Sequence, residues 1–243
     1  MFSQVILCAL ALSPLAAAHG KVAVITGDLG GNGTALGIKG AVVAGAGDNS
    51  KTEIDTTVFW SQKITTDGDI GYTEGGSGNN QLTDLVQSMA LSGSTLPQVS
   101  SGGSVSGTFH IVTTDGAGPL EALIDTSASG KWSNASTATV STQVPGNNGN
   151  IAAPTQRSLW ARTMVKLGIT KRAANVNEDY PFAVEIPAGT SCTGTISGQS
   201  NLCLVKVSNN NPAGPFGGVF AVQMGSSAAT TTRVKRSAKF IQI

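Results

Sequence analysis

The chain has 243 residues, of which 31 are glycine and only 12% are charged, with a formal net charge of +1. Charged residues are about half as frequent as in an average protein, and Ser, Thr and Asn are abundant, which is typical of an extracellular β-domain and excludes a disordered polyelectrolyte. The charge balance gives no indication of nucleic-acid binding. Apolar runs are too short to span a bilayer, so we expect no membrane partner.

The N-terminus has the organisation of a secretory signal peptide. A short apolar run, Val5–Leu12, is followed by a turn at Pro14 and by three small residues, Ala16–Ala18. This order predicts cleavage between Ala18 and His19, with residues 1–18 removed. The protein is therefore expected to be extracellular, and a histidine becomes its first residue.

The remaining chain is long enough for one sizeable β-domain, which we assign to residues 19–224. Within it, residues 151–175 contain five basic side chains and no acidic one. We interpret this segment as a basic insertion that forms an exposed helix or loop. Residues 225–243 form a basic tail that we expect to be loosely ordered.

Alternating apolar residues and turn signals predict a series of short strands and little helix. Apolar residues at helical spacing predict one short amphipathic helix over Leu82–Leu91. The strands 107–112 and 120–124, joined by the turn 114–119, are expected to pair as a β-hairpin. The fold class is thus all-β, an antiparallel β-sandwich of immunoglobulin-like or fibronectin-like type with long Gly-rich loops and one or two short helices. The expected strands are 22–25, 99–105, 107–112, 120–124, 138–144, 180–186, 202–207 and 218–224.

Three cysteines and two sequons bear on secretion. Cys8 leaves with the signal peptide, so Cys192 and Cys203 remain as a pair that we expect to form a disulfide in an oxidising compartment. The sequons at Asn32 and Asn134 are potential N-glycosylation sites.

The two histidines, His19 and His110, are the strongest chemical signal. An N-terminal histidine offers its α-amine and its imidazole Nδ1 to one metal ion, and a second imidazole would complete three nitrogen ligands. Such a histidine brace selects Cu(II), so one copper ion is the expected cofactor. The alternative is that the N-terminal position is a coincidence and that His110 is a half-buried strand residue bonded to backbone.

Other catalytic interpretations find less support. A Ser-His-Asp triad lacks the G-x-S-x-G turn that usually presents its serine. The Gly-rich segment 27–33 has no lysine and no helix signal after it, which argues against a phosphate-binding loop. A pair of glycosidase carboxylates is the remaining interpretation, but the carboxylates near His110 lie in and after a turn, where Asp is common.

Several motifs occur together in a characteristic order. They are His19-Gly20, FH-x-V-x-x-DGAGP over 109–119, VPGNNG over 144–149, IPAG over 186–189, CTGTISGQSNLC over 192–203 and NPAGPFGGVFAVQ over 211–223. With these motifs the chain resembles the fungal appressorium-associated secreted virulence factors of the MAS-type, Egh-like family. That resemblance implies an extracellular protein of infection structures with a role in host penetration.

The pattern of an N-terminal histidine, a second strand histidine and a β-rich body is also similar to that of lytic polysaccharide monooxygenases. This similarity implies copper chemistry with O2 or peroxide on a polysaccharide C–H bond. By the same analogy, Phe220 or Phe216 is the axial aromatic and Gln223 the second-sphere residue. Residues 220 and 223 fall on opposite faces of a regular strand, so both reach copper only if the strand has a bulge.

Three functional hypotheses therefore remain open. The first is an oxidative enzyme of cell-wall polysaccharide, the second a non-enzymatic copper-binding or surface protein that contacts the host, and the third a structural effector in which both histidines are incidental. Aromatic residues for a sugar-binding platform are scarce, because Trp60, Trp132 and Trp160 are the only tryptophans and Trp60 is expected in the core.

Overall fold

The structure is a computed structural model that describes residues 20–39, 54–73, 78–152 and 175–225. The predicted signal peptide, His19, most of the basic insertion, Trp160 and the basic tail lie outside these residues. The predictions made for them therefore stay predictions.

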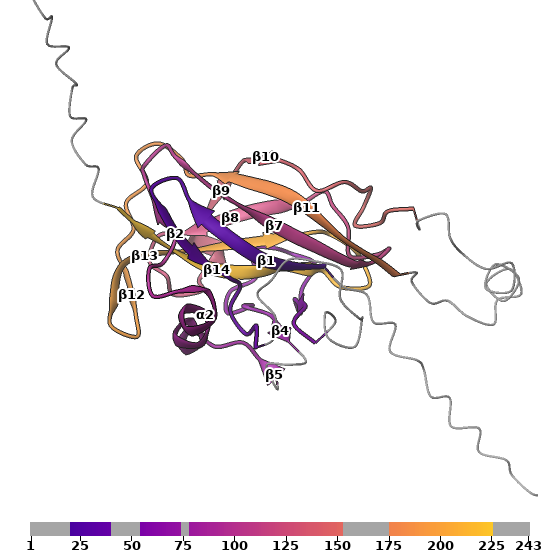
Figure 1. The fold of residues 1–243 in the computed structure, drawn as a ribbon, viewed down its shortest axis with the longest axis horizontal. Helices are drawn as coiled ribbons and strands as arrows, with labels where there is room; N and C mark the ends of the chain where they lie inside the picture. The colour runs from indigo at the N-terminus through magenta and orange to yellow at the C-terminus, as the bar shows by residue number, and fades with distance from the viewer. Residues whose placement is uncertain (1–19, 40–53, 74–77, 153–174, 226–243) are drawn as a thin grey trace, which may run out of the picture.

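The described chain is mostly β-structure, as its alternating apolar pattern predicts (Figure 1). The strands of the N-terminal half are β1 Gly20–Gly27, β2 Gly30–Gly33, β3 Thr57–Val58, β4 Tyr72–Thr73, β5 Gly78–Asn79, β6 Gln98–Val99 and β7 Ser104–Thr113. Those of the C-terminal half are β8 Glu121–Asp125, β9 Ser136–Ala138, β10 Val140–Thr142, β11 Asn175–Glu185, β12 Gly194–Ile196, β13 Gln199–Ser208 and β14 Phe216–Met224. Two 3₁₀ turns, η1 Leu82–Asp84 and η2 Trp132–Asn134, and one α-helix, α2 Leu85–Ser92, complete the described elements.

All these strands belong to one hydrogen-bonded sheet, in which eight strands have the order β10-β11-β7-β1-β14-β13-β8-β9. The other six, β2, β3, β4, β5, β6 and β12, pair outside this order. The two ends of this order, β9 and β10, follow one another in the chain with only Thr139 between them. The segment 136–142 therefore pairs with β8 on one side and with β11 on the other. The immunoglobulin-like or fibronectin-like sandwich is not confirmed, because the strands form a single sheet that curves round to this shared segment.

The predicted hairpin between 107–112 and 120–124 is wrong. β7 pairs with β1 and β11, whereas β8 pairs with β13 and β9. The loop between them does turn, with the backbone N–H of Gly116 bonded to the carbonyl of Thr113, but it carries the chain to a distant part of the sheet. A turn motif sets the local path of the backbone and leaves open which strand the next one joins.

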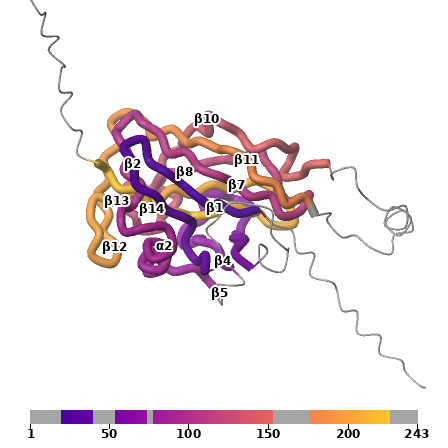
Figure 2. Tube along the Cα trace, viewed as in Figure 1, coloured from indigo at the N-terminus to yellow at the C-terminus, as the bar shows by residue number. Residues whose placement is uncertain are grey.

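A core fills the space between the two halves of the curved sheet. Apolar residues of β1, β7 and β11 meet those of β8, β13 and β14 there, and the rings of Phe182 and Phe220 pack edge to face with centroids 6.5 Å apart. Figure 2 shows β7, β11 and β1 running alongside one another. Such burial excludes water from the apolar side chains and stabilises the curved sheet.

A second core covers the outer face of β13 and β14. Val219 and Ala221 of β14 pack there with Phe59, Trp132 and residues of α2, which lies on the side of the sheet where β4 and β5 are found (Figure 1). β13 and β14 are thus buried on both faces, which explains their nearly continuous apolar sequence.

The helix predicted over Leu82–Leu91 is confirmed as η1 followed by α2, with Leu85 buried in the second core. Among the described residues, no helix has the length and apolar character to cross a membrane.

Candidate functional site

His110 is a fully buried residue of β7 whose two ring nitrogens have different surroundings. Its Nδ1 lies 2.6 Å from Oδ1 of Asp179 on the neighbouring strand β11. Because a carboxylate only accepts hydrogen bonds, Nδ1 carries the proton of this contact. The other nitrogen, Nε2, is buried and has no hydrogen-bond partner among the residues that the structure describes. In the neutral ring, Nε2 thus holds a free lone pair, which is the state of a metal-binding imidazole.

Charged residues flank His110 in a row across three strands. Asp179 of β11 is in register with His110, and so is Lys21 of β1. Burial lowers the pKa of Lys21, and the negative charges of Asp55 and Asp179 oppose this shift. The row of Lys21, His110 and Asp179 therefore combines two buried basic groups with a carboxylate that is about one-third exposed.

The start of β1 is held close to the loop that follows β7. Gly20 pairs with Ile111, and a Cβ at Gly20 would lie 2.3 Å from the carbonyl oxygen of Gly116 and 2.5 Å from the ring of Phe109. Only glycine fits this close approach. The His-Gly and FH-x-V-x-x-DGAGP motifs are thus in contact through Gly20, although His19 itself lies outside the described residues.

The described residues alone do not make a metal site of three ligands. No group of three or more His, Cys, Asp and Glu side chains gathers in the part of the chain that the structure covers. His110 supplies one available nitrogen, and Gly20, which is covalently bonded to His19, pairs with the residue next to His110. A three-nitrogen site at this end of β1 would need the amine and imidazole of residue 19.

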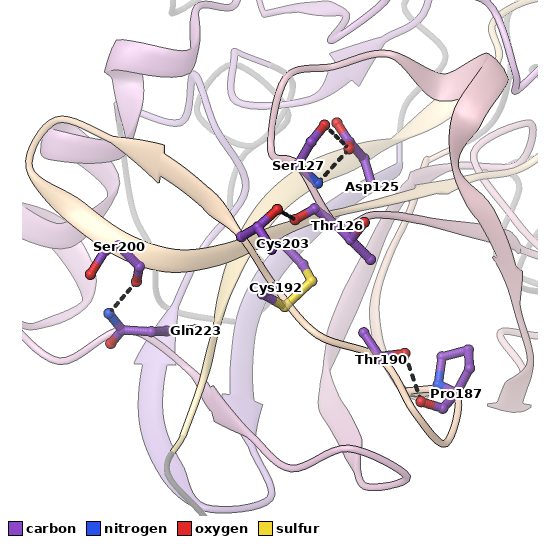
Figure 3. Close-up of a disulfide and its surroundings, with 10 residues drawn as sticks. Asp125, Thr126, Ser127, Pro187, Thr190, Cys192, Ser200, Cys203 and Gln223 are labelled. Atoms are coloured by element: carbon purple, nitrogen blue, oxygen red, sulfur yellow. Dashed lines mark hydrogen bonds between the residues drawn. A yellow bond between two sulfur atoms is a disulfide. The ribbon is translucent and has the colours of Figure 1, made fainter.

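The structure does not bring Phe220 or Gln223 to His110. Phe220 packs with Phe109 in the core, and Phe109 precedes His110 in β7, so the imidazole and the Phe220 ring lie on opposite faces of the sheet. The side-chain amide of Gln223 donates to the carbonyl of Ser200, as Figure 3 shows, and its Oε1 accepts from Gln98.

Phe216 comes nearer along β14, because it precedes Gly217, which pairs with Lys21. The alternation of the strand, however, directs the Phe216 side chain to the face opposite that of the row. Gln223 is on the same face of β14 as Gly217, but it lies six residues further along the strand, where Gln98 and Ser200 bind its side chain. None of the three residues suggested by analogy therefore lies beside the imidazole.

The predicted disulfide is present between Cys192 and Cys203 (Figure 3). It joins the segment before β12 to the middle of β13, and these two strands form a hairpin that was not predicted. Ser197 and Gly198 make its two-residue turn, both with positive φ as this tight connection requires. The sequon residues Asn32 and Asn134 are both exposed, as glycan attachment needs.

The sequence analysis did not connect Asp179 with His110, and it misplaced Trp60. Nothing in the sequence around Asp179 links it to a histidine 69 residues away, because the link is a strand pairing. Trp60 was expected in the core, but its side chain is 65% exposed and stacks on Tyr72 with ring centroids 4.5 Å apart. Its apolar neighbour Phe59 is the buried residue of that segment.

Comparison with known proteins agrees with the motif pattern. Residues 17–217 match the Egh16-like virulence factor family. The chain is 36% identical over 217 residues to the appressoria-specific virulence factor GAS1 of Pyricularia oryzae, in a match that covers 88% of this chain and 75% of GAS1. It is 34% identical over 134 residues to the appressoria-specific virulence factor GAS2 of the same fungus, which covers 55% of this chain and 39% of GAS2. The chain therefore belongs to the Egh16-like virulence factor family.

Proposed function

We propose that the chain is a secreted, infection-related protein that binds one copper ion through the α-amine and imidazole of His19 and Nε2 of His110. The single observation that carries the proposal is the buried Nε2 of His110, for which the described part of the chain offers no hydrogen-bond partner. A buried polar nitrogen without a partner costs free energy, and a bound ligand would remove that cost. The pairing of Gly20 with Ile111 supports His19 as the source of the other two nitrogens.

Asp179 has the role of a positioning residue in this proposal. Its carboxylate accepts the Nδ1 proton of His110 and so keeps the lone pair on Nε2. A carboxylate behind a metal-binding imidazole fixes the ring orientation and raises its basicity. Asp179 also places a negative charge in register with the imidazole and near the ammonium group of Lys21.

Copper in such a brace would supply activation of O2 or peroxide for oxidation of a polysaccharide C–H bond. The proposed substrate is cell-wall polysaccharide, and the appressorium-specific virulence factors to which the chain is similar agree with a role in infection. A non-enzymatic copper-binding or surface protein is the second candidate. It is favoured because Phe220 and Phe216 face away from His110 and Gln223 is bound to Gln98 and Ser200 at the far end of β14.

Copper binding is tested on secreted protein whose N-terminus has been established as His19 by mass spectrometry. We expect one copper per chain in calorimetric titration and a paramagnetic resonance spectrum with nitrogen couplings. In His110→Asn, the side-chain amide can still donate to Asp179 while Nε2 is lost, so this variant should fold and lose the tight site. A matched protein with one extra glycine before His19 should also lose it, because the chelating amine is displaced.

Asp179→Asn should weaken copper binding by about 10- to 100-fold, as loss of a supporting carboxylate does at other metal sites. Equal copper affinity in wild type and His110→Asn would refute the brace. Tight copper binding without reductant-dependent oxidised products from chitin, cellulose, pectin or glucan would favour the non-enzymatic candidate.

A further inference from the structure

Trp60 is the most exposed of the large hydrophobic side chains in the described part of the chain, at 65%. The others of this kind, Leu29, Ile54 and Val86, are aliphatic. Exposed tryptophan has a large apolar face and is enriched at binding sites, where it contributes more than other residue types. A tryptophan kept in solvent next to a well-packed core is therefore a candidate for ligand contact.

The segment that carries Trp60 is fixed by buried contacts. The carboxylate of Asp69 accepts the backbone N–H groups of Trp60 and Ser61, each at 3.2 Å. The backbone carbonyl of Asp69 in turn accepts Nζ of Lys206 at 2.8 Å and Nε1 of Trp132 at 3.1 Å. Both donors are fully buried, so the backbone at Trp60 is tied to the second core.

The ring of Trp60 is also supported from one side. Tyr72 of β4 stacks against it with an interplanar angle of 30°, which leaves the opposite face of the indole for solvent or a ligand. β4 lies on the side of the sheet that carries α2 (Figure 1). A ring held in one orientation loses little conformational entropy when a ligand stacks on it.

The segment that carries Trp60 joins β14 next to the residue that pairs with Lys21. The residue before it, Phe59, donates its N–H to the carbonyl of Pro215, and β3 pairs with β14 at Phe216. The next residue of β14, Gly217, pairs with Lys21, which is in register with His110. Since neighbouring strands are about 4.8 Å apart, the segment of Trp60 is close in the fold to this row, of which only Asp179 is partly exposed.

We propose that the outer face of Trp60, supported by Tyr72, is a binding site for a neutral β-1,4-linked polysaccharide chain. A β-linked pyranose presents a face of C–H groups that matches a flat aromatic ring, and its edge presents hydroxyl groups. Gln62 and Lys63, both exposed beside Trp60, offer hydrogen-bond donors for those hydroxyls. This site requires no metal and so goes beyond the copper proposal.

The test is depletion binding of the secreted full chain, stripped of copper, to insoluble chitin and to insoluble cellulose as separate arms. Wild type should bind at least one polymer, Trp60→Ala should bind about tenfold more weakly or worse, and Trp60→Phe should keep most of the affinity. Val86→Ala is the matched control for loss of an exposed hydrophobic side chain and should bind as wild type does. Wild type should bind equally well with and without copper, which separates this site from the copper site.

Three outcomes would overturn the proposal. They are no binding of wild type to either polymer, equal binding by wild type and Trp60→Ala, and an equal loss in Trp60→Ala and Val86→Ala. Trp60→Phe separates loss of stacking from misfolding. A fourth outcome that would overturn the proposal is a Trp60→Phe protein that folds and yet binds no better than Trp60→Ala.

Discussion

We predict that Lys206 makes the free energy of unfolding of this protein increase with pH above about pH 8. Its ammonium group is fully buried beneath Phe59 and Trp132, with Nζ 4.3 Å and 5.4 Å from their ring centroids. Burial lowers its pKa from 10.5 to about 8, and the charge and hydrogen bond of Asp69 only partly oppose this. The folded protein therefore releases this proton at a pH where the unfolded chain keeps it.

The sign and size of the effect follow from proton linkage. Between about pH 8 and pH 10.5 the unfolded state binds more protons at Lys206 than the folded state, so the free energy of unfolding increases with pH. The whole pKa shift changes the free energy of unfolding by about 3 kcal/mol, of which about 2 kcal/mol falls between about pH 7 and about pH 9.5. Below about pH 8 the full cost of burying the charge is present.

The assay is urea unfolding at about pH 7 and about pH 9.5 for wild type and Lys206→Met. Between the two pH values, the free energy of unfolding of wild type should increase by about 2 kcal/mol more than that of Lys206→Met. Lys63→Met, which removes an exposed lysine, serves as the control and should follow wild type. If wild type and Lys206→Met show the same pH dependence, the ammonium group is not desolvated as the structure indicates, and the reasoning fails.

The other predictions concern single contacts of the fold. Replacing Cys192 and Cys203 by serine opens a loop of sequence separation 11 and should lower the free energy of unfolding by about 3 kcal/mol in urea; an unchanged midpoint would contradict the loop-closure argument. Phe220→Ala leaves a core cavity and should cost about 3–5 kcal/mol by the same measurement, while copper affinity in titration stays unchanged because the ring faces away from the imidazole. Gly20→Ala forces a Cβ against the carbonyl oxygen of Gly116 and should lower the thermal midpoint by an amount equivalent to about 1–3 kcal/mol; a midpoint equal to that of wild type would show that this contact is looser.

Much of the secondary structure could be predicted from local pattern. The strand near Val22, the helix from Leu82, and the apolar strands β13 and β14 all follow from residue periodicity, which depends only on neighbours in the chain. The pairing of those strands could not be predicted in the same way. The expected hairpin after β7 failed because its turn motif describes a few residues, while strand partners are chosen by the packing of the whole core.

The same division applies to the candidate site. The presence of two histidines and the position of one at the predicted mature N-terminus are properties of the sequence. The carboxylate behind His110 comes from β11, and the sequence between them gives no periodicity that joins Asp179 to β7. Trp60 shows the converse error, because an apolar run of three residues cannot reveal which of them the sheet buries and which it leaves in solvent.

The sequence by itself determined the β-rich class, the cysteine pair, the short helix and the family motifs, since each depends on composition or on spacing along the chain. Only the tertiary structure decided that His110 stands between Lys21 and Asp179, that Phe220 lies behind it in the core, and that Trp60 faces solvent above Tyr72. The physical reason is that strand register and burial are set by contacts between segments far apart in the chain, and these contacts are stabilised only when the whole sheet has formed.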